Sequence, residues 1–141
     1  MGRIIDLEIP PQNRHLALVR RAVATAARLH RLLPDRRVDD LSLAVSEAVA
    51  NGIDAQAALG RDDPVQVRID LQPEAIAVTV VDHGGGFVPD AVDPVPAAED
   101  PRRLRHERGL GLALMRNLTD RVHWHRTGEG TAVSLEIRAP G

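Results

Sequence analysis

The fold is decided by the stretch VQVRIDL at residues 65–71, which is followed by QPEA at 72–75 and IAVTVV at 76–81. In the first segment apolar residues alternate with polar ones, and this pattern predicts a strand with one buried face. The last segment is nearly all apolar, which predicts a strand in the centre of a sheet. Between them, Gln72, Pro73 and Glu74 are typical of a turn. The stretch therefore predicts two strands of one sheet joined by a tight turn.

Upstream of this hairpin, the sequence predicts one strand and two helices. Residues 3–9 alternate as a half-buried strand does. Apolar residues then recur at helical spacing over residues 13–33. A second helix is expected from Asp39, a suitable N-cap, to Ala58.

Downstream of the hairpin, residues 82–108 show no periodicity of either kind. A stretch of this length inside a small domain predicts a functional lid or a disordered segment. A short helix is then expected over residues 109–118, and a final hairpin is expected to pair residues 122–126 with residues 131–138.

The order of these elements predicts the fold class α+β. Strands linked as hairpins, with helices in blocks, are typical of a two-layer α/β sandwich with helices on one face of the sheet. We expect that sheet to be mixed and mainly antiparallel. The chain has 141 residues, of which 43% are hydrophobic, and this suits a single domain over residues 1–141.

Composition excludes several classes of site and partner. The chain has no cysteine, which excludes disulfides, thiolate zinc sites and cysteine nucleophiles, and it has no lysine, which excludes Schiff-base chemistry. A net charge of −2 with one Phe and one Trp argues against a nucleic-acid surface. No apolar run is long enough to span a bilayer. We therefore expect a cytoplasmic protein that contacts neither nucleic acid nor a membrane directly.

The first segment with possible chemistry is the pair Glu47 and Asn51. A spacing of four residues places both side chains on one face of a helix. The Asn51 carbonyl oxygen suits Mg²⁺, and Glu47 is placed to accept a proton from an attacking hydroxyl. Taken alone, the pair is weak evidence, and an ordinary solvent-exposed helix face is favoured over a chemical role.

The second segment is DHGGGF at residues 82–87, directly after the apolar strand. Adjacent glycines are costly in backbone entropy, so they indicate either positive φ or close approach to a ligand. A carboxylate at the end of a strand, facing a glycine-lined pocket, suits an exocyclic amine. The alternative is a simple β-turn.

The third segment is RGLGLAL at residues 108–114, where glycines are expected to enter a helix. Free amides at a helix N-terminus, together with the macrodipole, bind phosphate. The segment fits neither a P-loop, which needs lysine, nor a Rossmann fingerprint, which needs a preceding strand. A lone Gly-x-Gly occurs often by chance.

Together, and in this order, the three segments resemble the N, G1 and G2 boxes of the GHKL (Bergerat-fold) ATP-binding proteins. The chain is more similar still to the small bacterial anti-sigma-factor serine/threonine kinases. This resemblance covers nearly the whole chain, including Gly130 and Thr131 in the final hairpin. It implies a Bergerat fold with a lid at about residues 87–108 over the nucleotide, and ATP and Mg²⁺ as cofactors.

The resemblance also implies roles for the first two boxes. Asn51 would hold the Mg²⁺ that bridges the phosphates of ATP, and Glu47 would be the general base for phosphoryl transfer. Asp82 would bond the adenine amine, in a pocket shaped by Gly84 and Gly86.

For the phosphates, the resemblance implies the following. Thr131 would line the phosphate side of the site, and either Arg105 or Arg108 would reach the γ-phosphate. The residues whose amides would cradle the phosphates are Gly109, Leu110, Gly111 and Leu112.

The chain departs from the family after Asn51, where relatives often continue Ala-x-x-His-Ala. Here the sequence reads GIDAQ at residues 52–56, so Asp54 and Gln56 either line the pocket or face solvent. This departure puts the phosphate side of the site in doubt. We expect His83, at a variable position, to be exposed.

The remaining histidines are expected to have no chemical role. His30 lies in a segment that superficially echoes a histidine-kinase phospho-acceptor, but the acid that usually follows is missing. His123 and His125 share one face of a strand, which favours a solvated face over a metal site.

The resemblance implies an ATP-dependent serine/threonine kinase that sequesters a sigma factor and phosphorylates an anti-anti-sigma (STAS-type) protein, with a possible homodimer. A second hypothesis is an ATP-binding regulatory module that controls partner binding without phosphotransfer. A third, unrelated hypothesis treats the glycines as turns in a nucleotide-free interaction protein.

Overall fold

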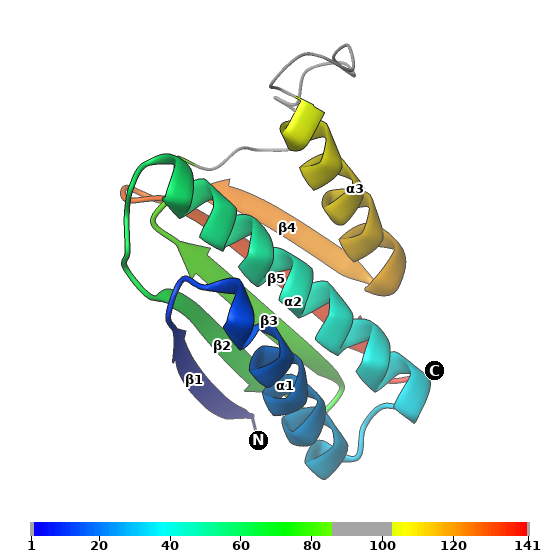
Figure 1. Ribbon diagram of the computed structural model, residues 1–141. Helices are drawn as coiled ribbons and strands as arrows, with labels where there is room; N and C mark the ends of the chain where they lie inside the picture. The colour runs from blue at the N-terminus through cyan, green and yellow to red at the C-terminus, as the bar shows by residue number, and fades with distance from the viewer. Residues whose placement is uncertain (1, 86–102, 141) are drawn as a thin grey trace.

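The structure, a computed structural model, describes residues 2–85 and 103–140, with the backbone alone for residues 103–110. Its strands form one five-stranded sheet in the order β1-β2-β3-β5-β4 (Figure 1). All four pairings are antiparallel, so the predicted antiparallel character is confirmed, whereas the prediction that the sheet is mixed is wrong. The strands are β1 (Arg3–Ile9), β2 (Val65–Leu71), β3 (Ala75–Asp82), β4 (Arg121–Arg126) and β5 (Thr131–Arg138).

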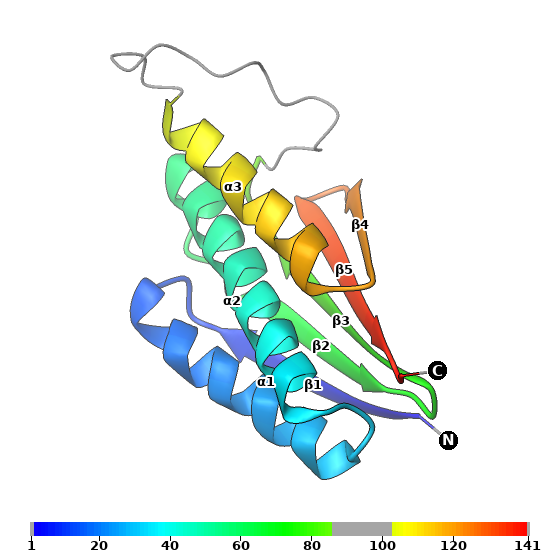
Figure 2. The same cartoon turned by 90° about the vertical axis from the view of Figure 1, so that its right-hand side faces the viewer.

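The helices lie together on one face of this sheet, as Figure 2 shows edge-on. They are α1 (Leu16–His30), which follows the short 3₁₀ turn η1 (Asn13–His15), then α2 (Asp35–Ala58) and α3 (Arg103–Leu118). Helix α2 runs between α1 and α3 and contacts both. The predicted α+β sandwich is confirmed. None of the helices in the described part of the chain is long and apolar enough to cross a bilayer.

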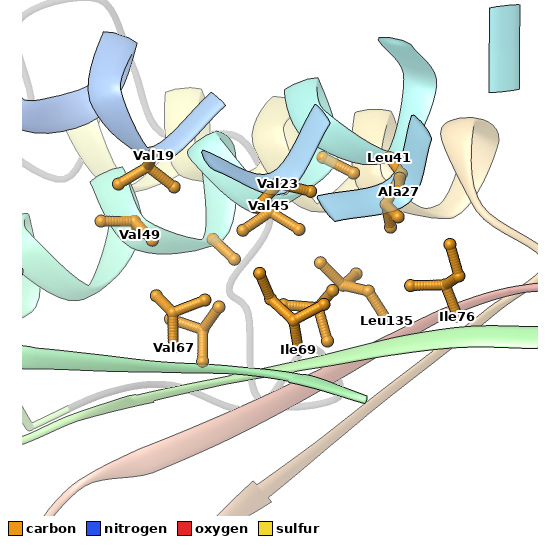
Figure 3. Close-up of a cluster of buried hydrophobic side chains, with 14 of the residues drawn as sticks. Val19, Val23, Ala27, Leu41, Val45, Val49, Val67, Ile69, Ile76 and Leu135 are labelled. Carbon is orange, nitrogen blue, oxygen red and sulfur yellow. The ribbon is translucent and has the colours of Figure 1, made fainter. Parts of the chain in front are cut away.

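The core between the two layers is aliphatic. Val45 of α2 and Val23 of α1 point down onto Ile69 and Leu135 of the sheet, and all four are at most 1% exposed (Figure 3). Removing each such side chain from water stabilises the fold by roughly 1.5–3 kcal/mol. The packed layer therefore fixes the position of α2 over β3 and β5.

The boundary between the first two helices differs from the prediction. Helix α1 ends at His30 and not at residue 33, because Arg31 adopts a left-handed conformation with φ 57°. Helix α2 begins at Asp35 and not after Asp39, since Pro34 is extended and starts the helix directly. Asp39 lies inside α2 and accepts a hydrogen bond from Arg28 at 3.1 Å.

The third helix also begins earlier than predicted. Helix α3 starts at Arg103, so residues 103–108, which were assigned to the lid, are helical. The reason is local: RLRHER consists of residues compatible with a helix, and a following glycine costs only about 1 kcal/mol. The rest of the predicted lid, residues 87–102, lies outside the described residues.

Candidate functional site

The predicted base-binding acid, Asp82, is the last residue of β3 and lies on the face of the sheet that the helices cover. Its side chain is buried, with 8% of the residue exposed. The Gly84 amide donates a hydrogen bond to Asp82 Oδ1 at 2.8 Å. A carboxylate is thus held beneath α2, with its second oxygen beside Gly52.

Burial raises the pKa of the Asp82 carboxyl above its usual range. Hydrogen bonds from the backbone amides of Gly84 and Thr131, and the neighbouring His83, oppose this rise and do not cancel it. The ionised carboxylate is therefore poorly solvated. A ligand that donates a hydrogen bond to this group would relieve that cost.

Three glycines enclose Asp82, and each is required by packing. A Cβ on Gly52 would lie 2.9 Å from Asp82 Cβ, and one on Gly84 would lie 2.8 Å from the Gln56 amide nitrogen. A Cβ on Gly130 would overlap the Asp82 carbonyl and lie 2.8 Å from His83 Cα. The sequence offered positive φ or close approach to a ligand as reasons for the glycines. At Gly84 the structure shows close approach to α2.

Gln56 holds the loop that follows β3 in place. The sequence analysis left open whether Gln56 lines the pocket or faces solvent. Its side chain is fully buried. Gln56 Nε2 donates to the Asp63 carbonyl at 2.6 Å, and Gln56 Oε1 accepts from the His83 amide at 2.8 Å. The amide thus ties the end of α2 to both neighbouring loops, whereas Asp54 faces solvent. The sequence signal that could have indicated this role was the departure from the family pattern at residues 52–56.

Glu47 and Asn51 lie one turn apart on α2, as predicted, and both are half-buried. A Cβ on Gly111 of α3 would lie 3.2 Å from Glu47 Oε2 and 3.6–3.7 Å from the two amide atoms of Asn51. Both side chains therefore converge on the backbone of Gly111. The structure brings the first and third predicted segments into contact.

Gly109 and Gly111 lie in the middle of α3, so the prediction that they start this helix is wrong. Their amides, and those of Leu110 and Leu112, belong to the interior of a helix, where amides bond to carbonyls four residues back. The side chains of Arg105 and Arg108, and all of Gly86, lie outside the described residues.

One pocket joins the predicted segments. It is lined by Asn51, Asp82, Leu112 and Thr131 from the prediction and by Ala48, Ala55, Met115, Trp124 and Val133 besides. Its volume is about 30 Å³, close to that of one water molecule. Within the described part of the chain, the buried Thr131 Oγ1 has no hydrogen-bond partner. A buried hydroxyl without a partner is costly, and a bound ligand would satisfy it.

Larger hollows lie elsewhere and hold none of the predicted residues. One of about 510 Å³ crosses the helix-free face of the sheet beside Asp6, Arg68 and Val81. His123 and His125 are exposed on this same face, as predicted. Among the described residues no group of three acids or histidines is placed to hold a metal ion.

The other histidines have structural positions. His30 Nε2 donates to the Gln72 carbonyl at 2.6 Å and ties α1 to the turn between β2 and β3. The prediction that His83 is exposed is wrong, since only 18% of its side chain is exposed. The turn after β4 covers it, with Glu129 Oε2 3.3 Å from His83 Nδ1.

Comparison with known families agrees with this arrangement. The model of the histidine kinase-like ATPase domain matches residues 9–137. The chain belongs to this family. Among its relatives, the serine-protein kinase RsbW of Bacillus subtilis is 28% identical over 122 residues, which cover 84% of this chain and 75% of the relative. The anti-sigma F factor of Pasteuria penetrans is 31% identical over 138 residues, covering 93% and 87%.

The fold is shared with a solved structure as well. A crystal structure of the RsbU and RsbW domains of a Mycobacterium tuberculosis protein superposes with a TM-score of 0.68 at 17% identity. The match covers 97% of this chain and 32% of that longer one.

Proposed function

We propose that this protein binds ATP in the pocket between α2, α3 and the end of β3. The observation that carries this proposal is the presence in one pocket of a desolvated carboxylate, that of Asp82, and of a buried hydroxyl, that of Thr131, which has no partner among the described residues. Asp82 accepts a hydrogen bond from the exocyclic amine of adenine. Membership of the ATPase-domain family supports the same ligand.

Asn51 is the residue that would hold Mg²⁺. Its amide oxygen is a hard ligand. Glu47 lies one turn away on α2, and both side chains face Gly111 of α3. Bound Mg²⁺ supplies neutralisation of phosphate charge. A single amide oxygen from the protein suits a cation that keeps several waters and takes its other ligands from the phosphates.

Binding of the phosphates requires free backbone amides at residues 109–112, and in this structure these residues lie inside α3. We propose that nucleotide binding unwinds the first part of α3, so that the amides at residues 109–112 become a free helix N-terminus. Gly109 and Gly111 make this region easy to unwind, because each weakens a helix by about 1 kcal/mol relative to alanine. Arg105 and Arg108, in the unwound part, are the candidates for the γ-phosphate.

The proposed reaction is phosphoryl transfer to a protein hydroxyl. Glu47 accepts the proton of a serine or threonine hydroxyl while that oxygen takes the phosphoryl group and ADP leaves. Relatives named serine-protein kinase and anti-sigma F factor support this activity. We propose that the phosphorylated protein is a STAS-type anti-anti-sigma factor, that the second partner is a sigma factor, and that the protein acts as a homodimer.

A second candidate is a regulatory module that binds ATP without transferring phosphate. One observation favours it: the Glu47 carboxylate faces the backbone of Gly111 and is half-covered by α3. A base in this position meets a protein hydroxyl only after α3 moves.

The test is transfer of label from γ-³²P-ATP to candidate STAS-type proteins in the presence of Mg²⁺. We expect wild type to label its partner, Glu47→Gln to lose nearly all transfer while still binding ATP, and Asp54→Asn, an exposed acid on the same helix, to match wild type. Equal transfer by Glu47→Gln would contradict the assigned base. ATP binding with no transfer to any partner would favour the regulatory module.

A further inference from the structure

The pocket that contains Asp82 and Thr131 is also lined by an aromatic residue, Trp124, which was not among the residues implied by the family resemblance. Trp124 is the only tryptophan of the chain and lies in the middle of β4, paired with Val133 of β5. Its side chain is half-buried on the helix-covered face, and it lines the pocket together with Asp82 and Thr131. An aromatic ring thus borders the cavity that is also lined by the desolvated Asp82 carboxylate and the buried Thr131 hydroxyl.

A cation holds this ring from the side of α3. The guanidinium carbon of Arg116 lies 5.1 Å from the centroid of the Trp124 ring. This distance is within the range of a cation–π contact. Arg116 is itself exposed, so the contact orients the ring at the surface rather than deep in the core.

The other apolar residues that line the pocket are aliphatic: Ala48, Ala55, Leu112, Met115 and Val133. A planar base gains more from an aromatic surface than from small aliphatic groups, because the two π systems pack face to face or edge to face. In the described lining, Trp124 alone offers such a surface. Trp124 and Asp82 line the same pocket from two strands separated by β5, so a base whose amine is held by the carboxylate extends toward the Trp124 ring.

We propose that Trp124 is a base-contacting residue of the nucleotide pocket, with its ring packed on the adenine and positioned by Arg116. This inference rests on the proposed function, since it needs a nucleotide in the pocket. It adds a second determinant of nucleotide specificity beside Asp82: the carboxylate accepts a hydrogen bond from the amine, and Trp124 packs against the flat ring of the base.

The single tryptophan allows a direct test by its own fluorescence. Wild-type protein is titrated with ATP, with ADP and with inorganic tripolyphosphate, each with Mg²⁺, and binding is measured in parallel by calorimetry. We expect ATP and ADP to change the intensity or wavelength of Trp124 emission on saturation. Tripolyphosphate, which lacks a base, should leave the emission unchanged even where calorimetry shows it bound.

Variants separate a base contact from a structural role. Trp124→Leu should weaken ATP binding about tenfold, and Trp124→Phe should restore most of it. Val122→Ala is the matched control, since Val122 is the inward-facing neighbour on β4 and does not line the pocket. Arg116→Ala should weaken ATP binding by a smaller factor, and Arg121→Ala, an exposed arginine beginning β4, should leave it unchanged. Tripolyphosphate affinity should stay constant across all five variants.

The outcomes separate the two proposals. If calorimetry shows ATP bound while Trp124 emission stays constant and Trp124→Leu binds as wild type does, the base contact is refuted and the ATP site stands. If Trp124→Leu and Val122→Ala weaken ATP and tripolyphosphate binding alike, Trp124 only supports the fold. If no nucleotide binds to the wild-type protein, both proposals fail.

Discussion

At the Asp82 end of the pocket, glycines pack against main chain, whereas at the Gly111 end a glycine meets only the tips of two side chains. A Cβ on Gly84 or Gly130 would press on backbone atoms of α2 or of the Asp82 loop. A Cβ on Gly111 would touch the ends of Glu47 and Asn51, which are able to turn away. In the proposed nucleotide site, the end that would hold the base is therefore rigid, and the end that would hold the phosphates is able to rearrange.

This difference assigns separate tasks to the two ends. A desolvated carboxylate held by a fixed backbone amide is preorganised for one hydrogen-bond donor, while the surrounding pocket of about 30 Å³ must widen to admit a base. Two interior glycines lower the free energy needed to unwind α3, and this suits a segment whose amides must become free to bind phosphate. In the proposed site, specificity for the base and response to the phosphates would thus reside in different elements.

The largest expected effect comes from adding a methyl group at the rigid end. Gly130→Ala should lower the free energy of unfolding by about 2–4 kcal/mol, because the new Cβ overlaps the Asp82 carbonyl and the backbone must shift. Gly128→Ala, in the same turn with no atom within 4 Å of its Cβ, is the control and should change stability by less than about 0.5 kcal/mol. Urea denaturation of both variants measures this. Similar losses in both would show that the turn is strained for another reason.

Removing the charge at the base end should affect binding and spare the fold. Asp82→Asn should weaken ATP binding about 10- to 100-fold, the worth of a hydrogen bond to a charged group. Its stability should be at least that of wild type, because a poorly solvated carboxylate is replaced by a neutral amide. Calorimetric titration and thermal melting measure the two effects. Wild-type affinity in Asp82→Asn would remove this residue from the site.

The raised pKa of Asp82 predicts two opposite responses to pH. Without ligand, protonation is easier in the folded state, so the stability that Asp82 contributes is present at low pH and is lost as pH rises from 3.8 through the raised pKa. With ATP, the amine donor needs the ionised form, so affinity falls as pH drops through that same pKa, by up to about tenfold per unit. Titrations across this window, with Asp82→Asn as the control, should show the pH dependence of affinity only in wild type.

The smallest effect is expected at the phosphate end. Gly111→Ala should stabilise α3 by about 1 kcal/mol and weaken ATP binding by about fivefold, because the helix becomes harder to unwind. Ala17→Gly, an exposed site on α1 away from the pocket, should lower stability without changing affinity. Melting and calorimetry on the two variants give the comparison. A Gly111→Ala protein that is more stable and binds ATP as tightly as wild type would mean that α3 does not unwind.

Sequence periodicity predicted the strands and the aliphatic core because both depend on local alternation, as at residues 65–71. The boundaries of two helices were missed: Arg31 ends α1 by its left-handed conformation, and α3 begins at Arg103, before the predicted start at Gly109. The pairing of Glu47 with Asn51 follows from helix geometry. Its meeting with Gly111, the burial of Gln56 and the place of Trp124 depend on tertiary packing, which no local pattern encodes.

The most direct test of the account is thermal melting of the wild-type protein with millimolar Mg-ATP, beside Asp82→Asn under the same conditions. A ligand at 100 times its Kd stabilises the folded state by about 2.7 kcal/mol, so wild-type Tm should rise by several degrees. Asp82→Asn should show a much smaller rise. An unchanged Tm in wild type would contradict the nucleotide site, and an equal rise in both proteins would place ATP somewhere other than against Asp82.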